Sequence, residues 1–251
     1  MILGAQLYTL RNEMKTVEGI EQGMHRVAAM GYHTVQVSGI GAIEPERLRA
    51  ICDKEGLSIV ITHTPQDRLL HDIDKVIAEH KILGCNLIGI GSMPSQYLYS
   101  LEGCEQFIKD YNPIARKVAA NGMRFMYHNH NQEFEKFDGR TIFDRLVEGL
   151  DPSVGFTVDT YWVQDAGCDP AALIERLPGR VPAVHFKDMA YVDRKVVMAP
   201  VGEGNLDWKR IAAACEKSGT KWALVEQDTC REDPFICLEK SLHNLQKLGY
   251  R

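Results

Sequence analysis

Strand-like runs alternate with helix-like segments along the whole chain, and this alternation constrains the fold more than any other feature. A parallel sheet whose strands are joined by helices produces such a pattern. We count roughly eight strand-helix units in 251 residues, the number and length that a closed (β/α)8 TIM barrel needs. We therefore predict an α/β fold, a single TIM-barrel domain over residues 1–251.

The expected elements follow from this periodicity. Strands are predicted near 3–8, 33–37, 57–62, 86–91, 123–128, 154–158, 181–186 and 222–226. Helices are predicted near 16–30, 44–55, 72–84, 101–121, 139–150, 169–177, 207–218 and 234–248. A doubly wound sheet would place a glycine-rich phosphate loop after the first strand, but Gln6–Arg11 contains no glycine. The barrel is therefore favoured.

Charge, hydropathy and cysteine content disfavour several classes of protein. The formal charge of −5 disfavours nucleic-acid binding, and no apolar run is long enough to cross a membrane. Seven cysteines without a CxxC pair are typical of free thiols in a reducing compartment. The first residues enter a strand pattern without the organisation of a signal peptide, so we expect a cytoplasmic protein that acts on a small molecule.

Three predicted strands in the second half end in residues that bind metals. Asp159, His185 and Glu226 each occupy the last position of a strand pattern. The carboxyl ends of barrel strands meet at one mouth, so these side chains are expected to converge there. Carboxylates with imidazole suit one divalent ion such as Mn²⁺, Mg²⁺, Co²⁺ or Zn²⁺.

The fourth ligand is ambiguous in the sequence. His128 and His130 alternate with Asn129 and can share one side of a strand, whereas Glu133 lies in the following loop. A carboxylate balances the charge of a cation better than a second imidazole does. We therefore predict Glu133 as the ligand and His128 as a group that moves protons. His130 is expected to bind substrate or to support a ligand.

Other polar residues lie near predicted strand ends. Tyr8, Gln36 and His63 are candidates for hydrogen bonds to a substrate, although packing explains each equally well. Trp162 follows Asp159 directly and offers a face on which a sugar ring can stack.

Lys187 is expected to place an ammonium group near the metal. It lies two residues after His185 and so shares its side of the strand. It can neutralise a developing enolate or pair with Asp188, and the sequence leaves both roles open.

With these residues in place, the chain resembles the sugar phosphate isomerase/epimerase family, the xylose isomerase-like barrels, which are related in fold to endonuclease IV. The resemblance spans nearly the whole chain. The stretches that carry it are Gly4–Arg11, Tyr127-His-Asn-His-Asn-Gln-Glu-Phe134, Val158-Asp-Thr-Tyr-Trp-Val163, His185-Phe-Lys-Asp188, Val201-Gly-Glu-Gly204 with Asp207-Trp208, and Val225-Glu-Gln-Asp228.

The resemblance implies one divalent ion, often manganese, held by Glu, Asp, His and Glu. The last three fall on Asp159, His185 and Glu226. The first is where this sequence departs from the family, because His128 stands at the end of strand five and Glu133 follows five residues later. Ketose epimerases use the glutamates of strands five and eight as opposing proton carriers, so a two-glutamate mechanism is in doubt.

The expected function is a metal-dependent sugar isomerase or epimerase that abstracts a proton next to a carbonyl, with His128 or Glu226 as base. If a leaving group departs, the same enediolate gives a lyase or dehydratase. Such reactions occur in family members that act on keto-glycosides or dehydrate inososes. Two other classes of protein are alternatives: a DNA-repair endonuclease, and a non-catalytic subunit of a barrel complex. A homo-oligomer or a partner subunit is compatible both with an isomerase or epimerase and with a lyase or dehydratase.

Overall fold

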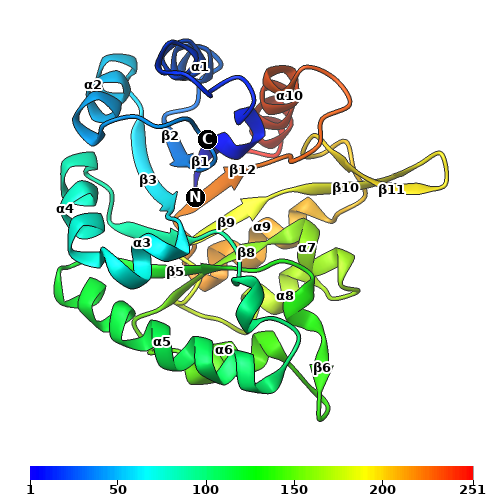
Figure 1. Ribbon diagram of the computed structural model, residues 1–251. Coiled ribbons are helices and arrows are strands. Elements are labelled where there is room, and N and C mark those ends of the chain that lie inside the picture. Colours follow the sequence, from blue (N-terminus) through cyan, green and yellow to red (C-terminus); the bar gives the residue numbers. More distant parts are fainter. Residues whose placement is uncertain (251) are drawn as a thin grey trace.

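Eight parallel strands form a closed barrel in a computed structural model that describes residues 1–250. Their order around the barrel is β1-β12-β9-β8-β5-β4-β3-β2, and Figure 1 shows the helices arranged outside them. The barrel strands are β1 (Ile2–Gln6), β2 (Thr34–Val37), β3 (Ser58–His63), β4 (Leu87–Ile90), β5 (Arg124–His128), β8 (Gly155–Asp159), β9 (Ala183–Phe186) and β12 (Trp222–Val225).

The outer layer consists of the helices that follow the barrel strands along the chain. They are α1 (Val17–Ala29), α2 (Pro45–Glu55), α3 (Gln66–His71), α4 (Ile73–Leu83), α5 (Leu101–Ala120), α6 (Ile142–Gly149), α7 (Thr160–Asp165), α8 (Pro170–Glu175), α9 (Trp208–Ser218) and α10 (Pro234–Lys247). Within residues 1–250, no helix combines the length and the apolar character needed to cross a bilayer.

Local chemistry explains where these helices begin and end. Thr16 and Ser100 accept hydrogen bonds from backbone N–H groups in the first turns of α1 and α5. Asp169 caps α8, whose first residue is Pro170. Helix α2 ends at Gly56, whose φ of 69° lies in the left-handed region that a side chain disfavours.

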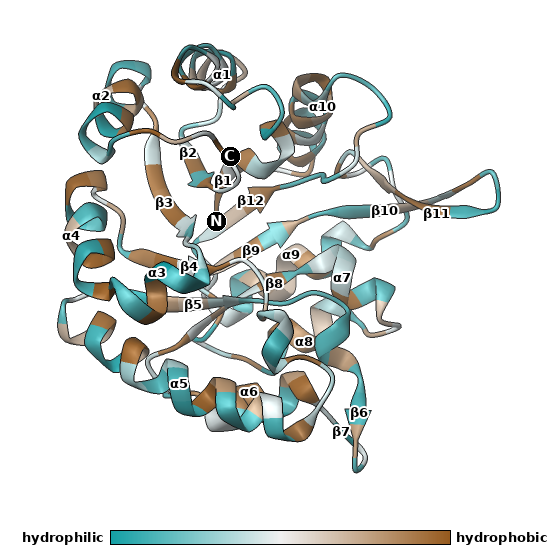
Figure 2. Ribbon diagram, in the orientation of Figure 1, coloured by the Kyte–Doolittle hydropathy of each residue, from teal (hydrophilic) through white to brown (hydrophobic). Residues whose placement is uncertain are grey.

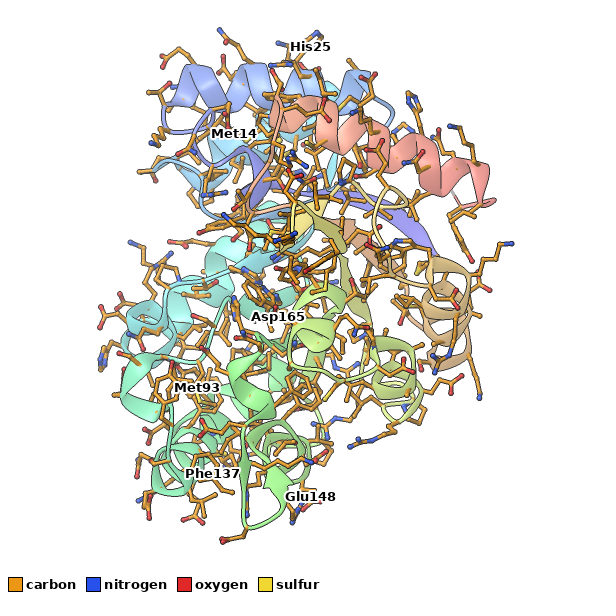
Figure 3. All side chains as sticks on the ribbon, turned by 90° about the vertical axis from the view of Figure 1, so that its right-hand side faces the viewer. Met14, His25, Met93, Phe137, Glu148 and Asp165 are labelled. Carbon is orange, nitrogen blue, oxygen red and sulfur yellow. The ribbon has the colours of Figure 1, made fainter. Side chains whose placement is uncertain are left out.

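Apolar strands form the core, and polar residues begin where the strands end. Every residue of β4 and of β8 is buried. Figure 2 shows hydrophobic colour along much of the barrel and hydrophilic colour at the arrowhead of β9. The outer helices turn one face to the surface and the other to the interior. In Figure 3, His25 points outward from α1, whereas the buried Met14 packs against this helix at Gly23. The polar strand ends thus gather at one mouth of an apolar barrel.

The predicted barrel is confirmed, and each of the eight predicted strands and helices has a counterpart. The structure adds short elements in the loops at the carboxyl ends of the strands. These are the helices α3 and α7, the 3-10 turns η1 (Leu7–Leu10), η2 (Ser95–Tyr97) and η3 (Gln132–Phe134), and two hairpins, β6 (Lys136–Phe137) with β7 (Arg140–Thr141) and β10 (Asp188–Val192) with β11 (Lys195–Ala199). The longer hairpin projects from the barrel in Figure 1.

Candidate metal centre and cavity

Four buried side chains from four strand ends converge at the mouth of the barrel. They are His128, Asp159, His185 and Glu226, and one potential ligand atom from each lies within 4.8 Å of the others. Strand register creates this arrangement, because Asp159 pairs with His185 and Glu226 follows the residue that pairs with Phe186. The predicted convergence of Asp159, His185 and Glu226 is therefore confirmed.

Hydrogen bonds fix which imidazole nitrogens face the cluster. Nδ1 of His128 lies 2.7 Å from the carbonyl oxygen of Gly91, and Nε2 of His185 lies 2.8 Å from Oε1 of Gln36. Both contacts require the imidazole to donate its N–H. The other nitrogen of each ring therefore offers a lone pair toward the cluster, which is the tautomer that a metal ligand needs.

One atom in the cluster is buried without a hydrogen-bond partner. Nδ1 of His185 lies 2.9 Å from Oε2 of Glu226, but the carboxylate oxygen is off the direction in which this nitrogen could donate. Nε2 of His128 is 3.4 Å from Oδ2 of Asp159. Nitrogen lone pairs and carboxylate oxygens thus face one another, which is unfavourable without a proton or a cation between them. This donor set fits a divalent metal.

Each carboxylate uses one oxygen as an anchor and leaves the other at the cluster. Oδ1 of Asp159 accepts the backbone N–H of Trp162 at 3.1 Å and caps α7. Oε1 of Glu226 accepts a hydrogen bond from Gln6 Nε2 at 2.9 Å. The remaining oxygens, Oδ2 and Oε2, are the ones that approach the histidines.

Lys187 lies beside the same two oxygens. Its Nζ is 3.4 Å from Asp159 Oδ2, 3.4 Å from Glu226 Oε2 and 2.6 Å from Asp228 Oδ2. Burial alone lowers the pKa of Lys187, but the three carboxylates outweigh this effect and raise its pKa above the ordinary value. The side chain therefore carries a positive charge in the interior.

The alternative pairing of Lys187 with Asp188 is wrong. Successive side chains of an extended chain point to opposite sides, and Asp188 points away from the cavity. Its carboxylate accepts hydrogen bonds from the backbone N–H groups of Met189, Gly202, Gly204 and Leu206 and from Trp208 Nε1. Asp188 thus ties the base of the β10–β11 hairpin to the start of α9.

The charges of the cluster depend on one another. Burial raises the pKa of Asp159 and Glu226, but Lys187 and the histidines outweigh it and hold both pKa values below the ordinary range. Burial also lowers the pKa of His185, whereas Glu226 and Asp159 raise it to about 9. Without a cation the site therefore favours bound protons, and a metal ion would displace them.

Glu133 does not join this cluster. Its Oε1 accepts the hydroxyl hydrogen bond of Tyr127 at 2.7 Å, and its Oε2 accepts the backbone N–H of His130 at 2.8 Å. The side chain is fully buried, and burial raises the pKa of Glu133. Both oxygens are thus used to hold the turn after β5, and His128 takes the fourth position in the cluster.

A cavity of about 470 Å³ opens above the cluster. Three predicted substrate contacts line it, namely Tyr8, His63 and His130. Gln36 instead binds His185, and Trp162 lies behind Lys187 and His130, with Nζ of Lys187 5.1 Å from the centre of its ring. The cavity is lined by Gln6, Tyr8, Ser38, Gly39, His63, Thr64, Pro65, Gln66, Ile90, Gly91, Ser92, Pro94, His128, His130, Lys187, Glu226 and Asp228.

Two neutral histidines in the cavity have unpartnered nitrogens. Nε2 of His63 and Nδ1 of His130 are buried without a hydrogen bond, and Nδ1 of His63 lies 3.1 Å from Ser38 Oγ. Burial, with the neighbouring histidines, lowers the pKa of His63 and lowers that of His130 to about 3. Both rings can therefore exchange hydrogen bonds with a polar ligand.

Several residues of the site were not predicted. Gln6 and Asp228 belong to quoted motifs, and Asp228 alternates with Glu226, which places both side chains on one side of an extended segment. Ser38 and Ser92 come from loops, and Gln66 begins the short helix α3; their sequences carry no distinctive pattern.

Comparison with known proteins agrees with this architecture. The sequence profile of a family described as xylose isomerase-like TIM barrel matches residues 24–240. The chain belongs to this family. A solved structure with a similar fold is that of a sugar phosphate isomerase/epimerase from Parabacteroides distasonis, with a TM-score of 0.81, 22% identity, and coverage of 97% of this chain and 93% of that one.

Two curated relatives match part of this xylose isomerase-like barrel. Inosose dehydratase of Lacticaseibacillus casei is 31% identical in an alignment of 140 positions that covers 48% of this chain and 45% of the relative. The rhizopine catabolism protein MocC of Rhizobium meliloti is 24% identical in an alignment of 166 positions that covers 59% of this chain and 50% of the relative. The chain spans about half the length of the curated relatives it matches.

Proposed function

We propose that the protein is a divalent-metal-dependent enzyme that removes a proton next to the carbonyl of an uncharged sugar or sugar derivative, as an isomerase or epimerase. The observation that carries this proposal is the buried donor set His128, Asp159, His185 and Glu226 at the floor of a polar cavity. We assign all four as metal ligands, with Mn²⁺ as the first ion to test.

The bound ion would supply a Lewis acid that polarises the carbonyl and acidifies the adjacent C–H. Since His128 has one nitrogen in the cluster and donates the other to Gly91, it has no nitrogen left to carry protons. Proton transfer then falls to Glu226 and to the neutral His63 and His130. Lys187 contributes a fixed positive charge next to the position where an oxyanion develops.

The charges that line the cavity favour an uncharged substrate. Among the described lining residues Lys187 is the one cation, and three carboxylates already surround it. Arg11 lies nearby, but it donates to the carbonyl oxygens of Tyr8 and Asp228 and does not line the cavity. A phosphate or carboxylate would find no unpaired cationic side chain among these described lining residues, whereas hydroxyl groups would find many partners.

Elimination of water is the second candidate. It is supported by His128, which stands where an epimerase carries its second glutamate, and by the likeness to inosose dehydratase. Loss of a hydroxyl group develops negative charge on the leaving oxygen, and the charged Lys187 faces the cavity. The same initial proton abstraction serves both candidates.

Deuterium incorporation tests the proposed chemistry. Protein loaded with Mn²⁺ is incubated in D2O with ketoses, inososes and keto-glycosides and followed by NMR, with protein in excess chelator as control. We expect metal-dependent deuterium exchange at a carbon beside the carbonyl, and the product distinguishes isomerase, epimerase and lyase. Absence of both metal binding and exchange would refute the enzyme and make a non-catalytic subunit the leading alternative.

The charges that line the cavity lead to a separate prediction about substrate affinity. A neutral cyclic polyhydroxy ketone and its phosphate monoester differ in one group, so their affinities can be compared by calorimetry on the Mn²⁺-loaded protein. We expect the phosphate ester to bind at least about tenfold more weakly, since burying an unpaired charge costs more than the roughly 1.4 kcal/mol that a tenfold change represents. Tighter binding of the ester would contradict the proposed substrate class.

Replacement of His128 by alanine is expected to weaken Mn²⁺ binding by more than about a hundredfold, because even residues that merely support a ligand contribute roughly ten- to hundredfold to affinity. Glu133→Gln is the matched control and is expected to keep the metal, since both oxygens of Glu133 are engaged elsewhere. Calorimetric titration of both variants decides the question. The opposite pattern would restore Glu133 as the fourth ligand.

A further inference from the structure

We infer that Lys187 is an internal counter-cation that competes with the metal for Asp159 and Glu226, and that Asp228 weakens this competition by holding the ammonium group to one side. The inference rests on the proposed function for the location of the metal. It assigns to Asp228 a positioning role, and it makes metal affinity an adjustable property of the Lys187–Asp228 pair.

The ammonium group of Lys187 lies between the two cluster carboxylates on one hand and Asp228 on the other. Nζ of Lys187 is equally far, at 3.4 Å, from the two oxygens that face the histidines, Asp159 Oδ2 and Glu226 Oε2. It is 2.6 Å from Oδ2 of Asp228, a carboxylate outside the group of four ligands. The short hydrogen bond therefore draws the charge away from the oxygens that a metal would use.

The ammonium group of Lys187 is confined to this site. Its side chain is 2% exposed, and its described hydrogen-bond acceptors are these three carboxylates. If Asp228 loses its charge, the ammonium group keeps only the two metal ligands as anionic partners. A buried cation moves toward the remaining anions because an unpaired charge in the interior is unfavourable.

The backbone around Asp228 is built to hold this geometry. Arg11 Nη2 donates to the carbonyl oxygen of Asp228 at 2.9 Å, and Thr9 Oγ1 accepts the N–H of Gln227 at 3.0 Å. The loop after β12 is thus fastened to the η1 turn after β1. These contacts hold the backbone at Asp228 in place without help from a ligand.

This arrangement gives Lys187 a different task in each state of the protein. Without metal it neutralises two buried carboxylates that would otherwise repel each other. With metal it must give up its contacts with both oxygens and rely on Asp228. Metal binding and the Lys187–Asp228 contact should therefore be thermodynamically coupled.

A double-mutant cycle tests the coupling. Mn²⁺ affinity is measured by calorimetry for the wild type, Asp228→Asn, Lys187→Gln and the double variant, all as full chains. We expect Asp228→Asn to weaken Mn²⁺ binding about tenfold, in the range known for residues that support a metal site, and Lys187→Gln to strengthen it by a similar factor. In the Lys187→Gln background, Asp228→Asn should change affinity by about threefold or less, because only the loss of a nearby negative charge remains.

Thermal unfolding of the metal-free forms gives a second readout. Lys187→Gln should melt at a lower temperature than the wild type without metal, and Mn²⁺ should raise its melting temperature by more than it raises that of the wild type. If Lys187→Gln does not fold, Lys187→Met replaces it in the cycle. If neither folds, Lys187→Arg serves instead: it keeps the charge, and an affinity close to that of the wild type supports the inference, whereas a tenfold gain overturns it.

The outcomes separate this inference from the proposed function. An equal effect of Asp228→Asn in both backgrounds overturns the inference and leaves the metal enzyme intact. A wild-type protein that binds no divalent metal overturns both.

Discussion

Glu226→Gln is expected to lose metal binding and deuterium exchange together. Glu226 supplies Oε2 to the ligand cluster while Gln6 holds Oε1, so both oxygens of the carboxylate have fixed tasks. Glutamine keeps the shape but removes the negative charge that attracts the cation and the group that accepts a proton. We expect Mn²⁺ affinity to fall by more than about a hundredfold, beyond the effect of losing a supporting residue.

Gln6→Ala is the matched control for this variant. It removes only the hydrogen bond that orients Glu226, so it is expected to weaken Mn²⁺ binding about tenfold and to retain measurable exchange. Titration calorimetry and NMR in D2O measure the two properties separately. A Glu226→Gln protein that binds Mn²⁺ as tightly as the wild type would show that Glu226 is not a ligand.

Asp188→Ala is expected to lower the free energy of unfolding by about 3–5 kcal/mol, because the buried indole N–H of Trp208 and several part-buried backbone N–H groups lose their acceptor at once. The carboxylate accepts the N–H groups of Gly202 and Gly204 and the indole N–H of Trp208 at 2.6–3.0 Å. The approach is so close that a Cβ on Gly204 would lie 2.3 Å from Asp188 Oδ1. A side chain on Gly204 would therefore collide with this carboxylate.

Urea unfolding of Asp188→Ala and of Asp74→Ala measures this effect against a control. Asp74 forms an ion pair with Lys117 on the surface, and its side chain is 82% exposed. Its removal is expected to change the free energy of unfolding by about 1 kcal/mol or less. Equal destabilisation by both substitutions would show that Asp188 has no special role in holding the hairpin.

The barrel could be predicted because its pattern repeats. Each apolar run, such as the one from Val154 to Val158, is followed by a helical segment, and eight repeats leave few alternative folds. Asp159, His185 and Glu226 could be predicted as a cluster for the same reason, since strand ends of a barrel meet whatever the loops do.

The fourth ligand could not be decided from sequence. Alternation fixes the direction of side chains within a strand, and His128 is the last residue of β5. Glu133 lies beyond the strand in a 3-10 turn, where alternation no longer applies. The hydroxyl group of Tyr127 and the N–H of His130 bind this carboxylate, and neither partner is recognisable from spacing alone.

Loop elements were missed for a related reason. The β10–β11 hairpin turns at Asp193 and Arg194, which both have positive φ values although neither is glycine. Without a glycine the turn resembles an ordinary polar loop. Asp228 was passed over because a carboxylate near a strand end is common, and its contact with Lys187 depends on how two loops meet in space.

The seam where the barrel closes also sets an order of events during biosynthesis. Strand β1 at the start of the chain pairs with β12, and the Gln6–Glu226 hydrogen bond crosses that seam. While the ribosome still holds residue 226, the nascent chain has two open sheet edges and an incomplete set of ligands. Such contacts between distant residues form slowly, and the unclosed intermediate exposes apolar strands to chaperones and to aggregation. The proposed metal ion would need the ligands that barrel closure brings together, so its binding would favour the last step of folding.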